Sequence, residues 1–471
     1  MAEADVVQLR FDDDLDATAR ARIAYAFRTF CAVYERRADV GDGAPAQAQL
    51  RYGVDRGYRL RPLEEPAPNP AYIRLPPRAV YQRLGITHMP LFHAAGERPD
   101  WLAEIFEWLS AADAYAIRDR DEAGRIPFAS SLHGRYGLDP TIPYASVAML
   151  ELADQLGLDP PRSTPTLVAA THDLDYIPIS RLGDLRRLIA NLGVAAIVDR
   201  DPLLFASIVG AVLRGIVQRR SPLDCIGTMI ERERALGIRS TSNVICRRTC
   251  RRDGNYALDD PGVVQVLRDL HEADAELGVH ASYMNIADRS LAEEVAALRG
   301  LGYDVHGGRA HWLRYGTDDL FEAIADAKLD YDTTAGFPNR VGFRNGASFV
   351  YRPYRFASES AYPFYEIPLA IMDGALYTDA REHRVSAAAL AARVLDMTDA
   401  FASGAISVLW HNTVFAGAQI PHSIGRLYWS LPRPTQRWTS AIEVVATRRD
   451  CHERAFCSNG LVASSGCRSA E

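Results

Sequence analysis

The sequence predicts an α/β protein, a distorted (β/α)7-type barrel preceded by a smaller α+β domain. From Thr166 onward, about seven short apolar stretches alternate with helical stretches, an order typical of parallel strands joined by crossover helices. The chain has 471 residues, too many for one ordinary hydrophobic core, which leaves room for an additional domain. No GxGxxG follows any predicted strand, so nothing indicates a dinucleotide-binding sheet.

Residues 1–160 are expected to form an amino-terminal α+β accessory domain. Residues 17–38 carry apolar side chains at helical spacing and predict an amphipathic helix. Residues 100–116 predict a second helix, with Asp100 as its N-cap. The Pro-rich stretch 61–77 between them is expected to be an extended connector.

The barrel is expected to span residues 161–445, after a Pro-containing boundary at 158–165. Its predicted strands are 166–171, 240–246, 277–282, 303–307, 331–337, 365–373 and 405–412, and its predicted helices include 260–276, 290–302, 317–329 and 386–404. A helix-rich insertion at about 178–235 separates the first two strands and is interpreted as a lid or an oligomer surface. The Ser/Gly-rich tail, 446–471, is expected to be disordered.

Composition and charge limit the possible partners and compartment. Hydrophobic content of 48% and charged content of 24% are those of a soluble globular protein, and a net charge of −7 argues against nucleic acid or an anionic membrane bound through bulk charge. Residues 1–20 lack a secretory signal pattern. The apolar run 201–220 reaches Arg214 too early to span a bilayer. Seven scattered cysteines do not resemble a disulfide framework, so we expect a cytoplasmic protein.

A titratable side chain follows nearly every predicted strand. In chain order these are Asp173 and Asp175, His280, His306 and His311, Asp332, Arg344, Asp373, and His411. Each one alone is more often a capping, surface or core residue than a functional one. Barrels, however, place their chemistry at the carboxyl ends of their strands, so the joint placement predicts a functional site.

The chemistry that suits this set is metal-assisted hydrolysis. One aspartate with two histidines is a ligand set for Zn²⁺ or another divalent transition metal, and it leaves positions for water and substrate. Such a metal lowers the pKa of its water and polarises an acyl oxygen. A second carboxylate can then accept the proton of the water, and a histidine on the far side can protonate a leaving amine.

The carboxyl-terminal two thirds resembles the polysaccharide deacetylase family, of the NodB-homology, carbohydrate esterase family 4 type. More closely, it is similar to a divergent bacterial branch with its own amino-terminal domain. The segments that carry the resemblance are THDLDY (171–176), GIRSTSNVI (237–245), LGVHASY (277–283), GGRAHWLRY (307–315), LDYDTTAGFPNRVGFRNGASFVYRPY (329–354), YEIPLAIMDGALY (365–377) and VLWHN (408–412). With residues 105–147, which resemble the unit preceding such domains, the likeness covers about residues 100–415.

The resemblance implies roles for the two aspartates. It implies that Asp173 is the general base, that Asp175 is the metal carboxylate and that Arg344 orients the base. The family carries adjacent aspartates, whereas here Leu174 separates them, so the two roles could be exchanged.

For the metal histidines, the resemblance points to His280 as the first ligand. The family's second histidine lies one helical turn later, where this chain has Met284, so the second ligand must come from elsewhere. RAHWL fits the branch better than VHGG, and His311 is therefore chosen over His306. If neither binds metal, the site is an inactive relic.

The resemblance further implies that His411 is the general acid and that Asp373 orients it. The expected function is then a metal-dependent amide hydrolase, with zinc as the favoured divalent metal, that removes an acyl group, acetyl in the first instance, from an amino sugar or related N-acyl compound. A cytoplasmic location favours a soluble carbohydrate or small-molecule substrate, and the oligomeric state stays open. Two alternatives remain, a non-catalytic relative that binds a glycan or partner and a metal-free lyase or isomerase using Asp173 with His411.

Overall fold

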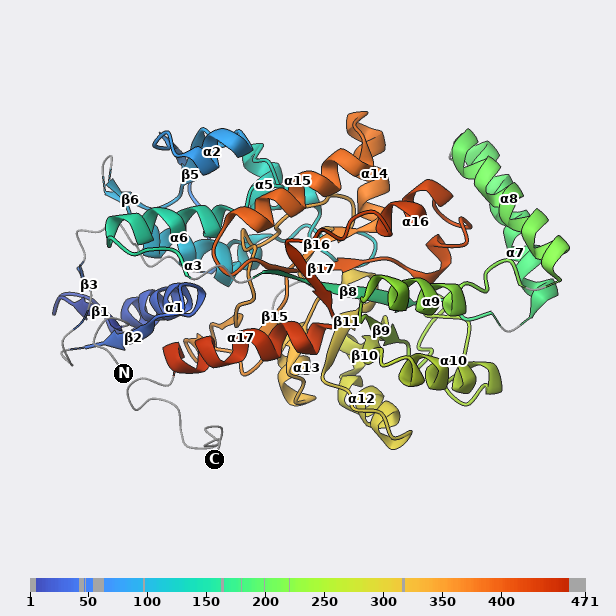
Figure 1. The fold of residues 1–471 in the computed structure, drawn as a ribbon. Helices are drawn as coiled ribbons and strands as arrows, with labels where there is room; N and C mark the ends of the chain where they lie inside the picture. Colours follow the sequence, from blue (N-terminus) through green and yellow to red (C-terminus); the bar gives the residue numbers. More distant parts are fainter. Residues whose placement is uncertain are drawn as a thin grey trace.

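The centre of the molecule is one curled sheet of nine strands, all paired in parallel. The computed structural model describes residues 6–41, 46, 48–53, 63–95, 98–161, 165–178, 180–198, 200–219, 221–315 and 318–456. The strand order is β15-β12-β11-β10-β9-β8-β17-β16, with β18 also on β8, and the described strands β15 and β16 at its two ends are not paired with each other. A parallel, barrel-like α/β fold with an additional amino-terminal part is confirmed (Figure 1).

Strand β8 (Thr166–Leu174) lies in the middle of this sheet and is buried at all nine positions. It pairs with β17 along one edge, and with β18 and then β9 along the other. The other strands are β9 (Thr241–Val244), β10 (Glu276–Ala281), β11 (Gly307–Ala310), β12 (Tyr331–Asp332), β15 (Tyr365–Glu366), β16 (Leu369–Met372), β17 (Ala405–Leu409) and β18 (Gln436–Thr439). A near-continuous apolar run is what a strand covered on both faces requires.

Several strands differ from the sequence prediction, and the strand predicted at 331–337 is reduced to β12 at Tyr331–Asp332. The predicted strand 365–373 is divided into β15 and β16, because Pro368 between them has no backbone N–H to donate to a ladder. The strand predicted at 303–307 begins only at Gly307, since Tyr303 N–H still donates to Leu298 O at the end of the preceding helix. Strand β18 was not predicted.

Helices surround the sheet (Figure 1). Those that follow the strands are α9 (Ile226–Leu236), α10 (Pro261–Glu272), α11 (Asn285–Asp288), α12 (Leu291–Gly300), α13 (Asp318–Asp326), α14 (Asp373–His383), α15 (Ala387–Ala400), α16 (His422–Tyr428) and α17 (Ala441–Phe456). Helix α17 includes residues 446–456, so the prediction of disorder from 446 is wrong there, because Val444, Val445 and Ala455 are buried. Residues 457–471 of the predicted tail lie outside the described residues.

The amino-terminal part combines small sheets with helices, as predicted. Its strands are β1 (Val6–Phe11), β2 (Arg37–Val40) and β3 (Ala48–Tyr52) in one parallel sheet, and the pairs β4 (Ala71–Arg74) with β5 (His88–Leu91) and β6 (Ala94–Ala95) with β7 (Arg98–Pro99). Its helices are α1 (Ala17–Val33), α2 (Ala79–Leu84), α3 (Trp101–Ser110), α4 (Asp113–Ala116), α5 (Leu132–Tyr136) and α6 (Tyr144–Gln155). Asp100 caps α3, where its carboxylate accepts a hydrogen bond from Ala103 N.

The amino-terminal part and the barrel share one hydrophobic core. A single cluster of buried side chains runs from Ile23 in α1 to Val168 in β8 and Val408 in β17. Polar contacts cross the same boundary, such as the hydrogen bond from Tyr25 Oη to Arg352 O at 2.7 Å. The two parts therefore pack as one body.

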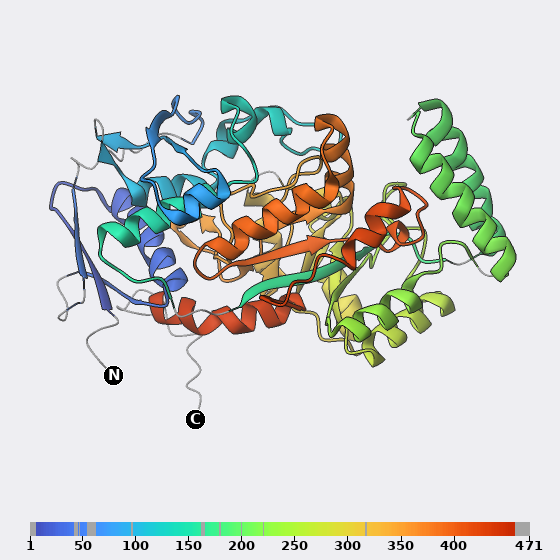
Figure 2. The ribbon, with the colours of Figure 1, turned by 45° about the horizontal axis from the view of Figure 1, so that its top comes forward.

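The insertion between β8 and β9 forms a helical hairpin that stands away from the barrel (Figures 1 and 2). It consists of α7 (Arg181–Gly193), a π-helical turn at Val194–Val198 and α8 (Pro202–Gln218). It projects on the side of the barrel opposite the amino-terminal elements, and α9 leads from it back to β9. Within the described part of the chain, no helix has the length and apolarity to cross a membrane.

The close approach of β11 to β10 generates a stability prediction. A Cβ at Gly308 would collide with the main-chain carbonyl oxygen of Val279, which cannot move without breaking the ladder. We expect Gly308→Ala to lower the free energy of unfolding by about 1–3 kcal/mol in urea titrations. Gly262→Ala in α10 is the control: a Cβ there meets no atom within 4 Å, and we expect no loss, or a gain of up to about 1 kcal/mol. Equal stability of the two variants would contradict this packing.

Candidate metal centre and active site

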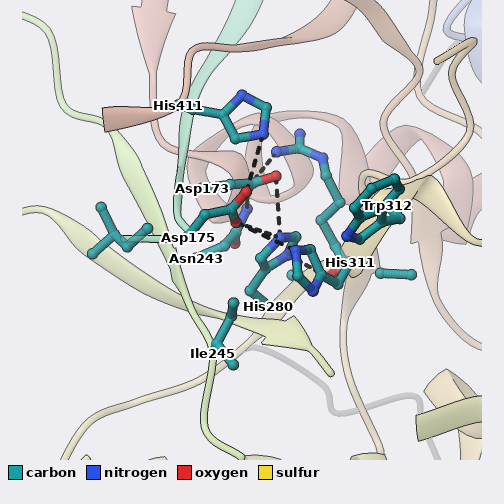
Figure 3. Close-up of polar contacts among 12 residues, drawn as sticks. Asp173, Asp175, Asn243, Ile245, His280, His311, Trp312 and His411 are labelled. Carbon is teal, nitrogen blue, oxygen red and sulfur yellow. Dashed lines mark hydrogen bonds and ion pairs between the residues drawn. The ribbon is translucent and has the colours of Figure 1, made fainter. Parts of the chain in front are cut away.

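Five of the predicted residues line one cavity at the carboxyl ends of the strands. The cavity is about 190 Å³ and is lined by Arg125, Asp173, Asp175, His280, His311, Trp312, Leu313, Met372, Leu409 and His411. The Asp173 side chain enters the site from β8 and the His280 side chain enters it from β10. The His311 side chain comes from the short 3₁₀ turn after β11 (Figure 3). His411 lies two residues after the end of β17 (Ala405–Leu409).

The spacing around Leu174 places both aspartates on the site side. Because β8 is still extended at Leu174, successive side chains point to opposite faces of the sheet. Leu174 is fully buried in the cluster that contains Val244 and Tyr256. Asp173 and Asp175 therefore both face the cavity, and the inserted leucine fills the hydrophobic core behind them.

Asp175, His280 and His311 form a group that can hold a metal ion. One ligand atom from each lies within 4.8 Å of the other two. Asp175 Oδ1 is 3.2 Å from His280 Nε2 and 3.7 Å from His311 Nε2. Asp175 Oδ1 and His280 Nε2 are both buried and make no hydrogen bond with the described protein atoms. Buried polar atoms are costly without a partner, so a cation shared by these three side chains fits the donor set.

The outer nitrogens of the two histidines are fixed by the protein. His280 Nδ1–H donates to Arg309 O at 3.0 Å, and His311 Nδ1–H donates to Asp253 Oδ1 at 3.1 Å. These bonds leave the Nε2 atom of each histidine facing Asp175, the arrangement seen where histidines bind metal. Asp253 is itself held by backbone N–H groups of Thr249 and Tyr283.

Asp173 is buried and has strong partners on one of its two oxygens. Asp173 Oδ1 accepts hydrogen bonds from Arg309 Nη1 and Asn243 Nδ2, each at 2.8 Å. Asp173 Oδ2 lies 3.6 Å from His280 Nε2, beside the metal group. Burial opposes ionisation, but the charge of Arg309 and the neighbouring histidines lower the pKa of Asp173 below its ordinary value. The carboxylate is therefore ionised at neutral pH, with one oxygen available to the cavity.

His411 lies on the side of Asp175 that faces away from His280 and His311 (Figure 3), and it is oriented by Asp373. Asp373 accepts hydrogen bonds from His411 Nδ1 at 2.9 Å and from His411 N at 2.6 Å. His411 Nε2 points into the site, 3.6 Å from Asp175 Oδ2. Burial lowers the pKa of His411, but the Asp373 carboxylate and the two site aspartates outweigh it and raise the pKa to about 10. At neutral pH this histidine is therefore in its doubly protonated, positively charged form.

Arg344 does not lie in the site, and the prediction that it orients Asp173 is wrong. Its guanidinium donates to Gly336 O at 3.1 Å and stacks over the Tyr315 ring. The arginine beside Asp173 is Arg309 of β11, which is 1% exposed and also donates to Thr171 Oγ1 and Thr333 O.

His306 and Met284 also lie outside the metal group. His306 precedes β11, at the amino end of that strand, and pairs with Asp330 Oδ2 at 2.9 Å. Met284 is exposed and is not among the residues that line the cavity. The structure thus brings His311, and not His306, to Asp175 and His280.

Three residues that bind the aspartates and histidines of the site were not predicted, namely Arg309, Asn243 and Asp253. Arg309 had a signal, since a charged residue within the Gly-rich strand GGRA must find a buried partner. Asn243 is likewise a polar residue within a predicted strand, STSNV, and so also needs a buried partner. Asp253 lies in a loop turn, and nothing in its local sequence indicates a contact with His311.

Comparisons with known proteins bear on the fold. No protein-family model matches the chain, and a search of curated proteins found no match. Among solved structures, a Mycobacterium smegmatis protein described as a polysaccharide deacetylase matches at 13% identity and a TM-score of 0.39, over 65% of this chain and 97% of that one. An allantoinase matches at 12% identity and a TM-score of 0.38, over 64% of this chain and 94% of that one. A Bacillus anthracis pseudoenzyme of the CE4 family matches at 11% identity and a TM-score of 0.28, over 61% of this chain and 68% of that one.

Two of these three structures are described by the family that the sequence resemblance named, as a polysaccharide deacetylase and as a CE4 family pseudoenzyme. At such identities and TM-scores the likeness concerns the general course of the chain. What the protein does is therefore argued from the side chains of the site.

The outer bond to His311 gives a prediction for metal binding. We expect Asp253→Asn to weaken zinc binding about 10–100-fold in calorimetric titration, because the amide no longer fixes the His311 ring through a charged acceptor. His311→Ala should lose more, and His306→Ala, at the other end of β11, should bind zinc like the wild type. Loss of zinc in His306→Ala with retention in His311→Ala would overturn the ligand assignment.

Proposed function

We propose that the protein is a metal-dependent amide hydrolase that removes an acyl group, acetyl in the first instance, from an amino sugar or a related N-acyl compound. The observation that carries the proposal is the arrangement around Asp175. Two buried atoms without hydrogen-bond partners, Asp175 Oδ1 and His280 Nε2, support a metal position between them, and an ionised carboxylate and a protonated histidine flank it. Zinc is the metal that this Asp/His/His set favours.

In the proposed reaction, Asp173 accepts a proton and His411 donates one. A zinc ion held by Asp175, His280 and His311 would supply Lewis acidity toward water and the acyl oxygen. Asp173 is the base, because Arg309 and Asn243 bind its Oδ1 and leave Oδ2 to accept a proton on the cavity side. His411 then donates its Nε2 proton to the leaving amine, and Asp373 stabilises the imidazolium until the transfer.

The same geometry supports the assignment of Asp173 as base and Asp175 as ligand. Asp173 Oδ1 is committed to two strong hydrogen bonds, whereas Asp175 Oδ1 has none and lies nearest to both histidines. Asp173 Oδ2, at 3.6 Å, is also farther from His280 Nε2 than Asp175 Oδ1 is, at 3.2 Å.

Trp312 supports a carbohydrate substrate. Its side chain is 43% exposed and lines the cavity, where an aromatic face can pack on a sugar ring. Trp312 and Leu313 both have positive φ, at 63° and 50°, a conformation that costs free energy for residues with a Cβ. Such strain is characteristic of functional sites, and here it accompanies the placement of Trp312 at the cavity.

The base assignment predicts separate losses of activity and metal. We expect Asp173→Asn to retain zinc while acetate release from N-acetylated sugars falls about 10²–10⁴-fold, because the amide cannot accept the proton. Asp330→Asn, which alters a carboxylate paired with His306 away from the cavity, is the matched control and should keep full activity. Undiminished hydrolysis in Asp173→Asn would refute the assignment. Zinc binding without hydrolysis of any N-acyl sugar by the wild type would instead favour the non-catalytic binding protein.

The His411–Asp373 pair predicts a change in the pH profile. The acid form of a group with a raised pKa persists to higher pH, so the wild type should lose kcat/KM only as pH rises toward the His411 pKa of about 10. In Asp373→Asn the carboxylate that raises this pKa is gone, and the alkaline limb should move down by about 1–3 pH units. An alkaline limb at the same pH in both enzymes would show that His411 is not the titrating acid.

A further inference from the structure

The α7–α8 hairpin exposes an unusual amount of apolar surface. Of the fifteen large hydrophobic side chains that are exposed among the described residues, nine lie on this hairpin. Val217, Ile197 and Leu203 are the most exposed, at 80%, 75% and 72%. Exposed apolar side chains gathered on one element mark a place where another apolar phase or molecule binds.

This outer surface is not needed for the packing of the hairpin itself. Leu204, Ile208 and Ala211 of α8 point inward and are buried with Leu188 of α7. The hairpin is also fixed to the barrel, where Ser207 Oγ donates to Gly417 O at 2.9 Å. Helix α8 is therefore apolar on its inner face and again on its outer face, which is typical of a helix covered on both sides.

The charges that border the apolar surface are positive. Residues 181–219 contain six arginines, three aspartates and no lysine or glutamate, although the whole chain has a net charge of −7. The described aspartates are buried. Asp184 accepts hydrogen bonds from Tyr176 and Ser221, and Asp201 caps α8. The exposed charges on the described part of the hairpin are thus those of arginines, including Arg186 and Arg200.

We propose that the α7–α8 hairpin docks the protein on a lipid bilayer with anionic headgroups. Leu203, Leu213 and Val217 would lie in the interfacial region, with the arginines among the headgroups. The hairpin lies on the membrane and does not span it, because α8 has 17 residues and carries Arg214. A second copy of the chain is a poorer partner, since a twofold contact would bring the same arginine-bordered surface against itself.

Docking through this hairpin is independent of the proposed hydrolase activity. It rests on exposure and charge in the insertion, and none of the residues that carry it lines the cavity. The low net charge of the chain does not oppose it, because the positive charge is local to the hairpin.

Vesicle co-sedimentation of the purified full-length protein tests the proposal. We expect binding to phosphatidylcholine vesicles that contain about a third phosphatidylglycerol, little binding to phosphatidylcholine alone, and weaker binding at about 0.5 M salt. Arg186→Gln should lower partitioning about fivefold. The double variant Leu213→Asp/Val217→Asp should abolish binding while its circular dichroism stays that of the wild type.

The matched control places the same charges on exposed apolar side chains elsewhere. Leu301→Asp/Val385→Asp changes residues that are 49% and 46% exposed outside the hairpin, and this variant should bind vesicles like the wild type. Absence of vesicle binding by the wild type would overturn the proposal. Equal binding to neutral and anionic vesicles would also overturn it. A third contrary result would be a wild-type protein that binds no vesicles but forms a dimer in sedimentation equilibrium, when Leu213→Asp/Val217→Asp is a monomer.

Discussion

A buried ion pair between Arg309 and Asp173 connects the parts of the site. The Arg309 side chain extends from β11 to β8, where it binds the Asp173 carboxylate and Thr171 Oγ1, while its backbone carbonyl accepts the Nδ1–H of His280. One residue thereby orients both the proposed base, Asp173, and a proposed metal ligand, His280. Removing one partner of such a pair leaves an uncompensated buried charge, which costs about 3–5 kcal/mol. The ionisation of Asp173 and the direction of the His280 lone pair both depend on this arginine.

Much of the site could be predicted because its residues follow strands. The carboxyl ends of parallel strands meet at one end of a barrel, so Asp173, His280 and His411 could be brought together from sequence order alone. Periodicity also predicted most strands and the additional amino-terminal part. The sequence RAHWL favoured His311 over His306 as the second histidine of the site. The structure explains the difference, since these two residues lie at opposite ends of β11.

The positions of Arg344 and Arg309 could not be predicted from the order of the strands. Arg344 follows the fifth predicted strand, but the chain after β12 leaves the barrel and packs on the amino-terminal part, where Ala145 N donates to Gly346 O. That excursion carries Arg344 to Tyr315. The GGRA sequence signals that Arg309 needs a buried partner, but which partners it reaches depends on the distances between three strands, and no local pattern encodes those distances. Asp253 reaches His311 through a loop turn, which sequence spacing does not determine either.

The amino-terminal part also forms a wall of the cavity. Arg125 lines the cavity, and its guanidinium donates to Trp312 O at 2.9 Å, so a residue from outside the barrel supports the strained turn after β11. The barrel and the amino-terminal part therefore form this cavity together. A substitution at Arg125 would change both the cavity wall and the support of Trp312 without altering any aspartate or histidine that lines the cavity.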